Sequence, residues 1–398
     1  MLFELPAELI TTTLSYLSPN ELQYYFDIEE LLTTFNICDP YLPIRTIALQ
    51  CYFEKKSLII TNSVDKYNNH HYYNNGIEIL ISQLELLKLK NIVINPREIN
   101  IFINDDNCNC GCFNISYNQF INQLIDLLPF ISTCCSKTNL VLNLTTDQLY
   151  NFSTLDHFFE KIKNVDNLSV KYTGENVINF QNLKINKIQL QFFNLNKLLN
   201  HLQVNNISNT QHLELKYNSI TNLVYLNLSN NNFVSLNFSN NNLVSVTDDY
   251  FNWKVLHNLE VLDLSNNNIV ELNLSGKSNF DYRLRKLNLF ANNLRKLPNF
   301  SGCKFFDNLE ELDISRNSIT ELPPNTFPAK LKKLWLKGNH LPDLIENLNG
   351  CIFPKTLTFL DLTYCRIVPI NKEHEKQIIK RLIEVEQLYK LKVLQLEF

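Results

Sequence analysis

The most regular feature of the chain is a spacing of apolar side chains interrupted by one asparagine. The pattern reads apolar-x-x-apolar-x-apolar-x-x-Asn-x-apolar, as in LEVLDLSNNNI and LRKLNLFANNL. It starts at Leu259, Leu284, Leu309, Leu331 and Leu357, and these starts lie 25, 25, 22 and 26 residues apart. In the last unit Cys365 takes the place of the asparagine. Such a fixed period predicts one supersecondary unit repeated along the chain.

Each unit has the pattern of a half-buried strand followed by a bend. Leu262 and Leu264 alternate with outward residues, so both point into a shared core. The asparagine amide can bond backbone groups of the bend that would otherwise be buried without partners. One unit cannot bury its own apolar edge, so the units must stack, and a period in the twenties is that of leucine-rich repeats. The pattern predicts an α/β solenoid, a leucine-rich-repeat horseshoe with parallel strands on its concave face.

The stretch LSNNNFVSLNFSNNN contains two overlapping matches to this pattern. One match starts at Leu223 and the other at Phe233, and ten residues are too few for a strand and its return path. Earlier matches start at Ile185 and Thr210, so Phe233 gives spacings of 25, 23 and 26, whereas Leu223 gives 13 and 36. We therefore expect the strand at Phe233 and the return path at residues 223–232.

Three segments are expected: helical residues 1–55, divergent repeats in 56–180, and regular repeats in 181–398. Short strands in the divergent segment are predicted at 57–61, 91–95, 139–144 and 167–172, and a helix at 115–131; an inserted small domain is an alternative there. In the regular repeats, Leu-Pro pairs at 297–298 and 322–323 favour loops and short 3₁₀ turns on the return path. After Pro369, a helix with one apolar face and the strand LKVLQLEF are expected to cover the end of the stack.

Residues 5–22 resemble the opening of an F-box, through Leu5-Pro6 and the apolar residues that follow. An F-box followed by leucine-rich repeats resembles the substrate receptors of SCF-type ubiquitin ligases. The resemblance implies that a Skp-type adaptor is bound by Leu5, Pro6, Leu9, Ile10, Leu14, Leu17 and Leu22. LQYYFDIEELLTTF stands where that family usually has a Val-Cys-Arg-x-x-Trp helix. A plain helical cap on the solenoid is the alternative interpretation.

The repeat template also predicts which side chains face a partner. Residues beside the buried leucines line the concave face, and aromatic and arginine side chains are the usual binding anchors. We expect a partner-binding patch of Phe290, Arg316, Trp335, Phe359 and Tyr364. The alternative is that Trp335 and Phe359 only pack on each other.

Composition and motifs argue against several other functions. The net charge is -4, the pI is near 6.1, and no run of lysines or arginines is present, so nucleic acid is not an expected partner. The start lacks the features of a signal peptide, and no long apolar run predicts a membrane span, so a cytoplasmic or nuclear protein is expected. Cys-x-Cys-x-Cys at residues 108–112 departs from zinc-ligand spacing, and no catalytic motif occurs. We expect no metal, no cofactor and no enzymatic activity.

The leading hypothesis for function is a substrate-recognition subunit of an SCF-type ubiquitin ligase. The first helices would hold the Skp-type adaptor and the cullin ligase core, and the concave face would select an unknown target protein. The alternative is a non-ligase scaffold or regulator that uses the same face, because leucine-rich repeats host many roles.

Overall fold

The structure is a computed structural model of the chain. It describes residues 11, 14–17, 22, 42–61, 76–79, 93–104, 117–131, 137–144, 152–174, 176–192, 194–205, 207, 210–226, 233–247, 257–274, 281–322, 327–341, 353–365, 372–373, 376–377, 380 and 393–395. The chain forms two compact units, Met1–Asn186 and Lys187–Phe398. The division falls inside β6 (Lys184–Gln191), slightly after the expected start of the regular repeats at residue 181.

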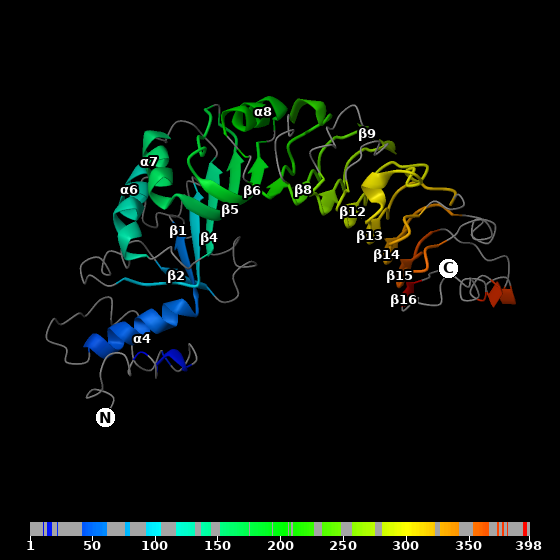
Figure 1. Cartoon of the computed structure of the whole chain (residues 1–398). Helices are drawn as coiled ribbons and strands as arrows, with labels where there is room; N and C mark the ends of the chain where they lie inside the picture. Colours follow the sequence, from blue (N-terminus) through cyan, green and yellow to red (C-terminus); the bar gives the residue numbers. More distant parts are fainter. Residues whose placement is uncertain are drawn as a thin grey trace. The chain divides into compact units, whose positions relative to one another are not determined.

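The first unit is built on a parallel sheet with helices between its strands. Its elements are α4 (Leu42–Glu54), β1 (Ser57–Thr61), β2 (Gly76–Ile79), β3 (Glu98–Asn104), α6 (Tyr117–Leu127), η3 (Leu128–Phe130), β4 (Lys137–Leu144), α7 (Phe152–Ile162) and β5 (Asn164–Tyr172). The strands run parallel in the order β2-β1-β3-β4-β5. The helices α6 and α7 pack against each other on one face of the sheet (Figure 1).

Apolar periodicity explains these elements. In β4, Leu140, Leu142 and Leu144 are buried while the residues between them are half-buried, as a period of two requires. In α7, Leu155 and Phe158 are buried at helical spacing. The helices therefore turn their apolar faces to the sheet, and the core of the unit lies between these two layers.

The expected elements of this unit are largely confirmed. The strands predicted at 57–61, 139–144 and 167–172 are β1, β4 and β5, and the predicted helix at 115–131 contains α6. At 91–95 the structure shows a single parallel bridge between Ile94 and Ile131. The strands β2 and β3 and the helix α7 were not expected, because none of them is followed by the asparagine bend on which the template depends.

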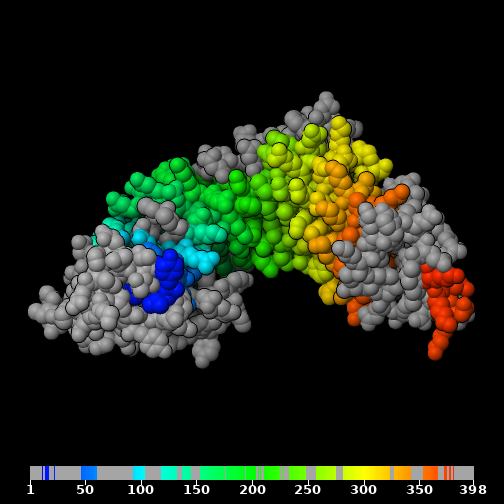
Figure 2. Space-filling view, turned by 60° about the horizontal axis from the view of Figure 1, so that its bottom comes forward, coloured from blue at the N-terminus to red at the C-terminus, as the bar shows by residue number. Residues whose placement is uncertain are grey.

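The second unit is a ladder of very short parallel strands. Its elements after β6 are α8 (Leu195–Val204), β7 (His212–Glu214), η4 (Val224–Leu226), β8 (Ser235–Asn237), β9 (Ser245–Thr247), β10 (Val261–Asp263), β11 (Glu271–Asn273), β12 (Lys286–Asn288), η7 (Lys304–Phe306), β13 (Glu311–Asp313), β14 (Lys333–Trp335), β15 (Phe359–Asp361) and β16 (Val393–Gln395). The main order is β6-β7-β8-β10-β12-β13-β14-β15-β16. Figure 2 shows the described repeats following one another in sequence order, from green to orange.

The register of this ladder confirms the repeat template. Leu262 pairs with Leu287, Leu287 with Leu312, and Leu312 with Leu334. All of these leucines are buried. Equivalent positions of successive repeats are therefore neighbours in one parallel sheet.

The ambiguous stretch around residues 223–242 resolves as predicted. The strand β8 follows Phe233 and pairs with β7 on one side and β10 on the other. Residues 224–226 form the 3₁₀ turn η4, so the match at Leu223 belongs to the return path. The spacing of the repeats, rather than the local similarity, identified the strand correctly.

The return paths contain the helix α8 and a second parallel sheet, and the sequence predicted neither. The strands β9 and β11 pair in parallel as a separate sheet, with Val246 opposite Leu272. Both side chains are buried. Three-residue strands leave too little period-2 pattern for a prediction.

The two ends of the chain are described only in part. The segment 1–55, expected to be helical, contains α4, and Lys55 Nζ donates to the carbonyl oxygens of Ser15, at 2.6 Å, and Leu17. At the other end, Lys372, Glu373 and Lys380 are helical and β16 pairs with β15, in agreement with the expected helix and final strand. The rest of the expected capping helix lies outside the described residues.

Candidate protein-binding face

A row of buried asparagines fixes the bend after each short strand. In the repeat of β10, Asn267 Nδ2 donates to Leu264 O and to Phe238 O of the preceding repeat, both at 3.0 Å. Its Oδ1 accepts from Leu243 N at 3.0 Å. The same pattern recurs at Asn241, Asn292, Asn317 and Asn339. The predicted structural role of the asparagine is confirmed, since it satisfies backbone groups that are buried at the bend.

Cys365 continues this row in a weaker form. Its Sγ lies 3.2 Å from Leu336 O, a carbonyl that also accepts from Asn339 Nδ2. Burial raises the pKa of the thiol to about 11. Cys365 is therefore a protonated structural residue at neutral pH rather than a reactive one.

The residue just before each asparagine adopts a left-handed backbone conformation. These corner residues have positive φ angles and are Tyr217, Asn240, Asn266, Ala291, Arg316, Gly338 and Tyr364. Glycine and asparagine are favoured in this region of backbone space, whereas arginine and tyrosine are not. Their side chains extend from the bend, and Arg316 is exposed while Tyr364 is 58% exposed.

The residue after each buried leucine of the strand forms a second structural column. In this column the side-chain Oδ1 accepts a hydrogen bond from the backbone N–H two residues later, at 2.9 to 3.0 Å, as in an Asx-turn. The residues whose Oδ1 accepts in this way are Asn237, Asp263, Asn288, Asp313 and Asp361. Glu214 and Trp335 occupy the same column without an Asn or Asp side chain. At these two positions the sequence lacks the Asn or Asp side chain that the Asx-turn requires.

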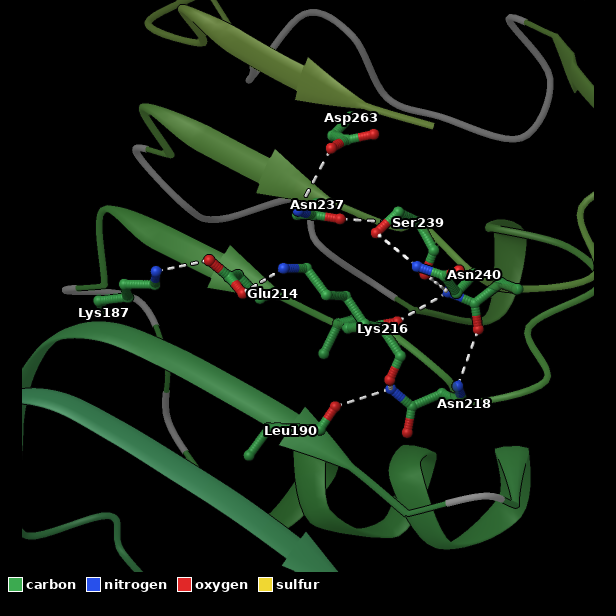
Figure 3. A network of polar contacts seen from close by, with 11 residues as sticks. Lys187, Leu190, Glu214, Lys216, Asn218, Asn237, Ser239, Asn240 and Asp263 are labelled. Carbon is green, nitrogen blue, oxygen red and sulfur yellow. Dashed lines mark hydrogen bonds and ion pairs between the residues drawn. The ribbon is translucent and has the colours of Figure 1, made fainter. Parts of the chain in front are cut away.

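Glu214 is the centre of an ion-pair network (Figure 3). Its Oε1 lies 2.5 Å from Lys187 Nζ and its Oε2 lies 3.0 Å from Lys216 Nζ. Burial alone would raise the pKa of this carboxyl, but the hydrogen bonds from Lys187 and Lys216 outweigh it and lower the pKa. The Glu214 carboxylate is thus paired within the chain by two lysines.

A second ion-pair network lies further along the face. Glu311 pairs with Lys286 at 3.0 Å and with Lys333 at 2.9 Å, and these contacts outweigh burial and lower its pKa. The neighbouring Asp313 has a raised pKa because burial dominates there, with smaller contributions from Asp361 and Asp263. The strand face therefore carries carboxylates that are either paired with lysines or partly buried.

Four of the predicted partner-binding residues contact one another in two pairs, one between rings and one between a cation and a ring. The rings of Trp335 and Phe359 are 5.1 Å apart at an interplanar angle of 45°. Arg316 Cζ lies 5.4 Å from the centre of the Phe290 ring. Trp335 and Phe359 do pack on each other, as the alternative interpretation held, yet both remain half-exposed.

The prediction of this patch omitted one contributing residue. Lys337 Nζ lies 5.1 Å from the centre of the Tyr364 ring, so Tyr364 contacts a cation in the same way as Phe290. Lys337 follows Trp335 by two residues in the same repeat. Its pairing with Tyr364 depends on the left-handed corner, which the apolar pattern does not reveal.

The comparison with family models agrees with this geometry. Residues 258–280 and 308–329 match the model described as Leucine Rich Repeat. The fold is a leucine-rich-repeat solenoid. Leucine-rich repeats bind protein partners, so the chain is a leucine-rich-repeat protein-binding module.

Solved leucine-rich-repeat structures resemble the chain at low sequence identity. An internalin from Listeria monocytogenes is 16% identical with a TM-score of 0.41, over 89% of this chain and 94% of the internalin. A leucine-rich-repeat protein from Leptospira interrogans is 17% identical with a TM-score of 0.38, over 88% of this chain and 92% of the other. The sequence matches no curated protein.

The predicted adaptor-binding residues are described only in part. Leu14 and Leu22 have no exposed surface within the chain, and Leu17 is half-buried. Leu5, Pro6, Leu9 and Ile10 lie outside the described residues. A fully buried side chain cannot contact an adaptor without rearrangement, so Leu14 and Leu22 act in this structure as core residues.

Neither a metal-ligand cluster nor a membrane-spanning helix is present among the described residues. No group of three or more His, Cys, Asp or Glu side chains is placed to hold a metal ion among the residues that the structure describes. The cysteines at 108–112 lie outside that part. None of the described helices is long and apolar enough to cross a membrane.

Proposed function

We propose that this leucine-rich-repeat module captures a protein target on the strand face of its second unit, at the patch around Trp335. The observation that carries the proposal is the presence of tryptophan in the Asx column. In five of the described repeats this position holds an Asn or Asp whose oxygen accepts a backbone N–H. An indole has no acceptor, so Trp335 cannot make this contact.

The column is polar at its other register positions, including Gln189, Glu214 and Gln395, so Trp335 is an aromatic residue at a position that is otherwise polar. Departures from a local structural rule are expected at functional sites. Trp335 is half-exposed and packs beside Phe359, with Arg316 and Tyr364 on nearby corners. Tryptophan, tyrosine and arginine dominate the energetics of protein interfaces.

The test uses Trp335→Asn, which introduces the side chain that equivalent repeats carry. Since asparagine can form the Asx-turn, the melting temperature should be unchanged or higher. Affinity for the target should fall by roughly 30-fold, because loss of an interface tryptophan costs about 2 kcal/mol or more. Affinity capture with quantitative mass spectrometry identifies the target, and calorimetry on the purified pair measures the loss.

Asp313→Asn is the matched control for this variant. It lies in the same column, keeps the Asx-turn acceptor, and should leave capture unchanged. Equal capture by wild type and Trp335→Asn would refute the proposed site, provided that both proteins melt at the same temperature.

The finer proposal is that the module serves as the substrate receptor of an SCF-type ubiquitin ligase. The F-box-like residues would bind a Skp-type adaptor, the cullin core would join through that adaptor, and ubiquitin transfer would be done by other subunits. The chain itself would then have no enzymatic activity and would act in the cytoplasm or nucleus.

Co-expression with a Skp-type adaptor tests this role. Leu17→Asp should abolish co-purification, whereas Tyr16→Ser, at a neighbouring side chain that is 84% exposed, should preserve both folding and binding. Circular dichroism distinguishes lost binding from lost folding. A wild-type chain that leaves the adaptor unbound would instead favour the non-ligase scaffold.

The scaffold alternative has its own supporting observation. Leu14 and Leu22 are buried within the chain, and Lys55 ties the end of the first helix to α4 through the carbonyls of Ser15 and Leu17. Such contacts also suit a segment whose role is to cap the first unit. The co-purification experiment separates the two roles.

A further inference from the structure

Lysines of the strand face and cations near the corners of the second unit have different kinds of partners. On the strands, Lys286 and Lys333 are paired with Glu311. Near the corners, Arg316 lies over the Phe290 ring and Lys337 over the Tyr364 ring. Among the residues that the structure describes, no carboxylate pairs with Arg316 or Lys337. The strand row therefore carries ion-paired lysines, whereas the cations Arg316 and Lys337 lie beside aromatic rings.

The contact with an aromatic ring leaves these cations able to bind an anion. A guanidinium that stacks on a ring uses its flat face, while its N–H groups point outward in the ring plane and can bond a carboxylate. Arg316 Cζ lies 5.4 Å from the centre of the Phe290 ring and Lys337 Nζ lies 5.1 Å from that of Tyr364, so a ring rather than a carboxylate is the neighbour of each cation. Ordering by the rings also reduces the entropy that each cation loses on binding.

A glycine separates the two long corner side chains. Arg316 N donates to Lys337 O and Gly338 N donates to Thr363 O, so the corners of Arg316, Gly338 and Tyr364 are consecutive in the stack. A Cβ atom at Gly338 would lie 3.5 Å from Arg316 Cγ. The corners of Arg316 and Tyr364 are then about 10 Å apart, two strand spacings, with only a glycine between them.

The acidic groups of the face restrict where a partner's anion can lie. Asp313 and Asp361 are on the strand row, and both accept hydrogen bonds from their own repeats. A second carboxylate above them would be repelled, whereas one above Gly338 would meet Arg316 and Lys337. The apolar pair Trp335 and Phe359 lies on the strands of the same repeats.

We infer that the partner presents a short acidic peptide segment in which an aromatic or aliphatic side chain lies within a few residues of an Asp or Glu. The apolar side chain packs on Trp335 and Phe359. The carboxylate lies above Gly338 and is bound by Arg316 and Lys337. This inference rests on the proposed target-binding face and specifies the chemistry that the face selects.

The experiment is a selection of random short peptides displayed on phage against the full chain and a variant with both cations removed. The variant is Arg316→Asn with Lys337→Ser, because Asn240 and Asn266 occupy the same corner and Ser239, Ser265 and Ser315 the same preceding position in other repeats. Lys304→Ser, at an exposed side chain of the 3₁₀ turn η7, is the matched control.

Peptides enriched by the wild type should combine an apolar residue with nearby Asp or Glu. Replacing those acids by Asn or Gln should weaken binding by about tenfold per contact and remove most of its salt dependence. The double variant should bind the acidic peptides no better than the neutral ones, while Lys304→Ser should behave like the wild type.

Several results would overturn the inference. In the selection, the contradicting results are enrichment of peptides without acidic residues or no enrichment at all. In binding measurements, they are an unchanged affinity of the double variant for the acidic peptides, or a single-stranded oligonucleotide that binds more strongly than the selected peptide. In light scattering, the contradicting result is self-association of the chain through this face. If Trp335→Asn still abolishes target capture in that case, the proposed function stands and only the acidic chemistry is rejected. If Trp335→Asn has no effect, the proposed function itself is rejected.

Discussion

Each of the two units contains a row of asparagines across neighbouring strands, but the rows bond different groups. In the first unit, Asn139 Nδ2 donates to Asn100 Oδ1 at 2.7 Å, and Asn167 Nδ2 donates to Asn139 Oδ1 at 2.6 Å. These bonds join side chains in the middle of long strands. In the second unit, Asn267 and Asn292 bond backbone groups at the bends.

The difference shows that the position of an asparagine relative to the bend decides how much its side chain stabilises the fold. A side-chain pair on a long strand adds to a ladder that backbone hydrogen bonds already hold. Three-residue strands make few such bonds, and the backbone groups of the following bend are buried without partners unless a side chain reaches them. The second unit therefore depends on its asparagines for folding.

The largest effect is expected for Asn292→Ala in the second unit. The change leaves Ile269 N without its side-chain acceptor and removes one of the two amide donors from Leu264 O and from Leu289 O, which Asn267 and Asn317 still bond. At about 1 to 3 kcal/mol for the unsatisfied N–H and about 0.5 kcal/mol for each lost bond to a carbonyl that keeps a second donor, the free energy of unfolding should fall by roughly 3 kcal/mol. Urea denaturation followed by circular dichroism measures the change.

The exposed neighbour Asn293 provides the control for this measurement. Asn293→Ala should change the free energy of unfolding by less than about 0.5 kcal/mol, as is usual for surface substitutions. Similar losses at the two positions would mean that the buried amide does not stabilise the bend.

A smaller effect is expected for Asn139→Ala in the first unit. Its partners are the side chains of Glu98, Asn100 and Asn167, and Asn139 is half-buried, so water can replace part of the lost bonding. The loss should be about 1 kcal/mol. Hydrogen exchange with mass spectrometry should show it only in peptides of the first unit, and a loss as large as that of Asn292→Ala would remove the distinction between the two rows.

The smallest change in stability at neutral pH is expected for a substitution of His201. This residue lies in α8, a helical return path of the second unit. His201 stacks on Phe192 at 4.0 Å, its Nδ1 lies 2.8 Å from Lys197 O, and burial lowers its pKa below the usual 6.5. The unfolded chain therefore binds more protons than the folded chain as the pH falls through 6.5, so stability should be full above that value and decrease below it.

Thermal denaturation between about pH 8 and about pH 5 measures this acid sensitivity. His201→Phe should reduce the sensitivity, and His157→Asn, at an exposed histidine of the first unit, should not. A pH dependence that survives His201→Phe unchanged would assign the effect to other groups.

The sequence was sufficient to predict the second unit because every repeat carries the same physical requirement. Leu262 and its equivalents must be buried, and an amide must satisfy the bend, so the same residues recur at a fixed spacing. The same logic placed β8 after Phe233. In the first unit the return paths are helices such as α7, and no fixed spacing marks where the next strand begins.

The candidate site was predictable only in outline. The template predicted a patch of Phe290, Arg316, Trp335, Phe359 and Tyr364, and in the structure Trp335 contacts Phe359 and Arg316 contacts Phe290. It did not predict the ring that each cation contacts, because this depends on positive φ angles at Arg316 and Tyr364. Nor did it indicate that Leu14 and Leu22 would be buried, because an apolar helix stripe has the same spacing whether it meets a partner or its own core.

Each bend asparagine bonds one carbonyl of its own repeat and one of the repeat before it, as Asn317 does with Ile314 and Leu289. A deletion within a repeat would leave a bend on one side of the cut without its amide. Removal of a complete repeat would let the next asparagine reach an equivalent carbonyl. Genes for such a chain can therefore grow or shrink in whole periods without leaving a bend unpaired.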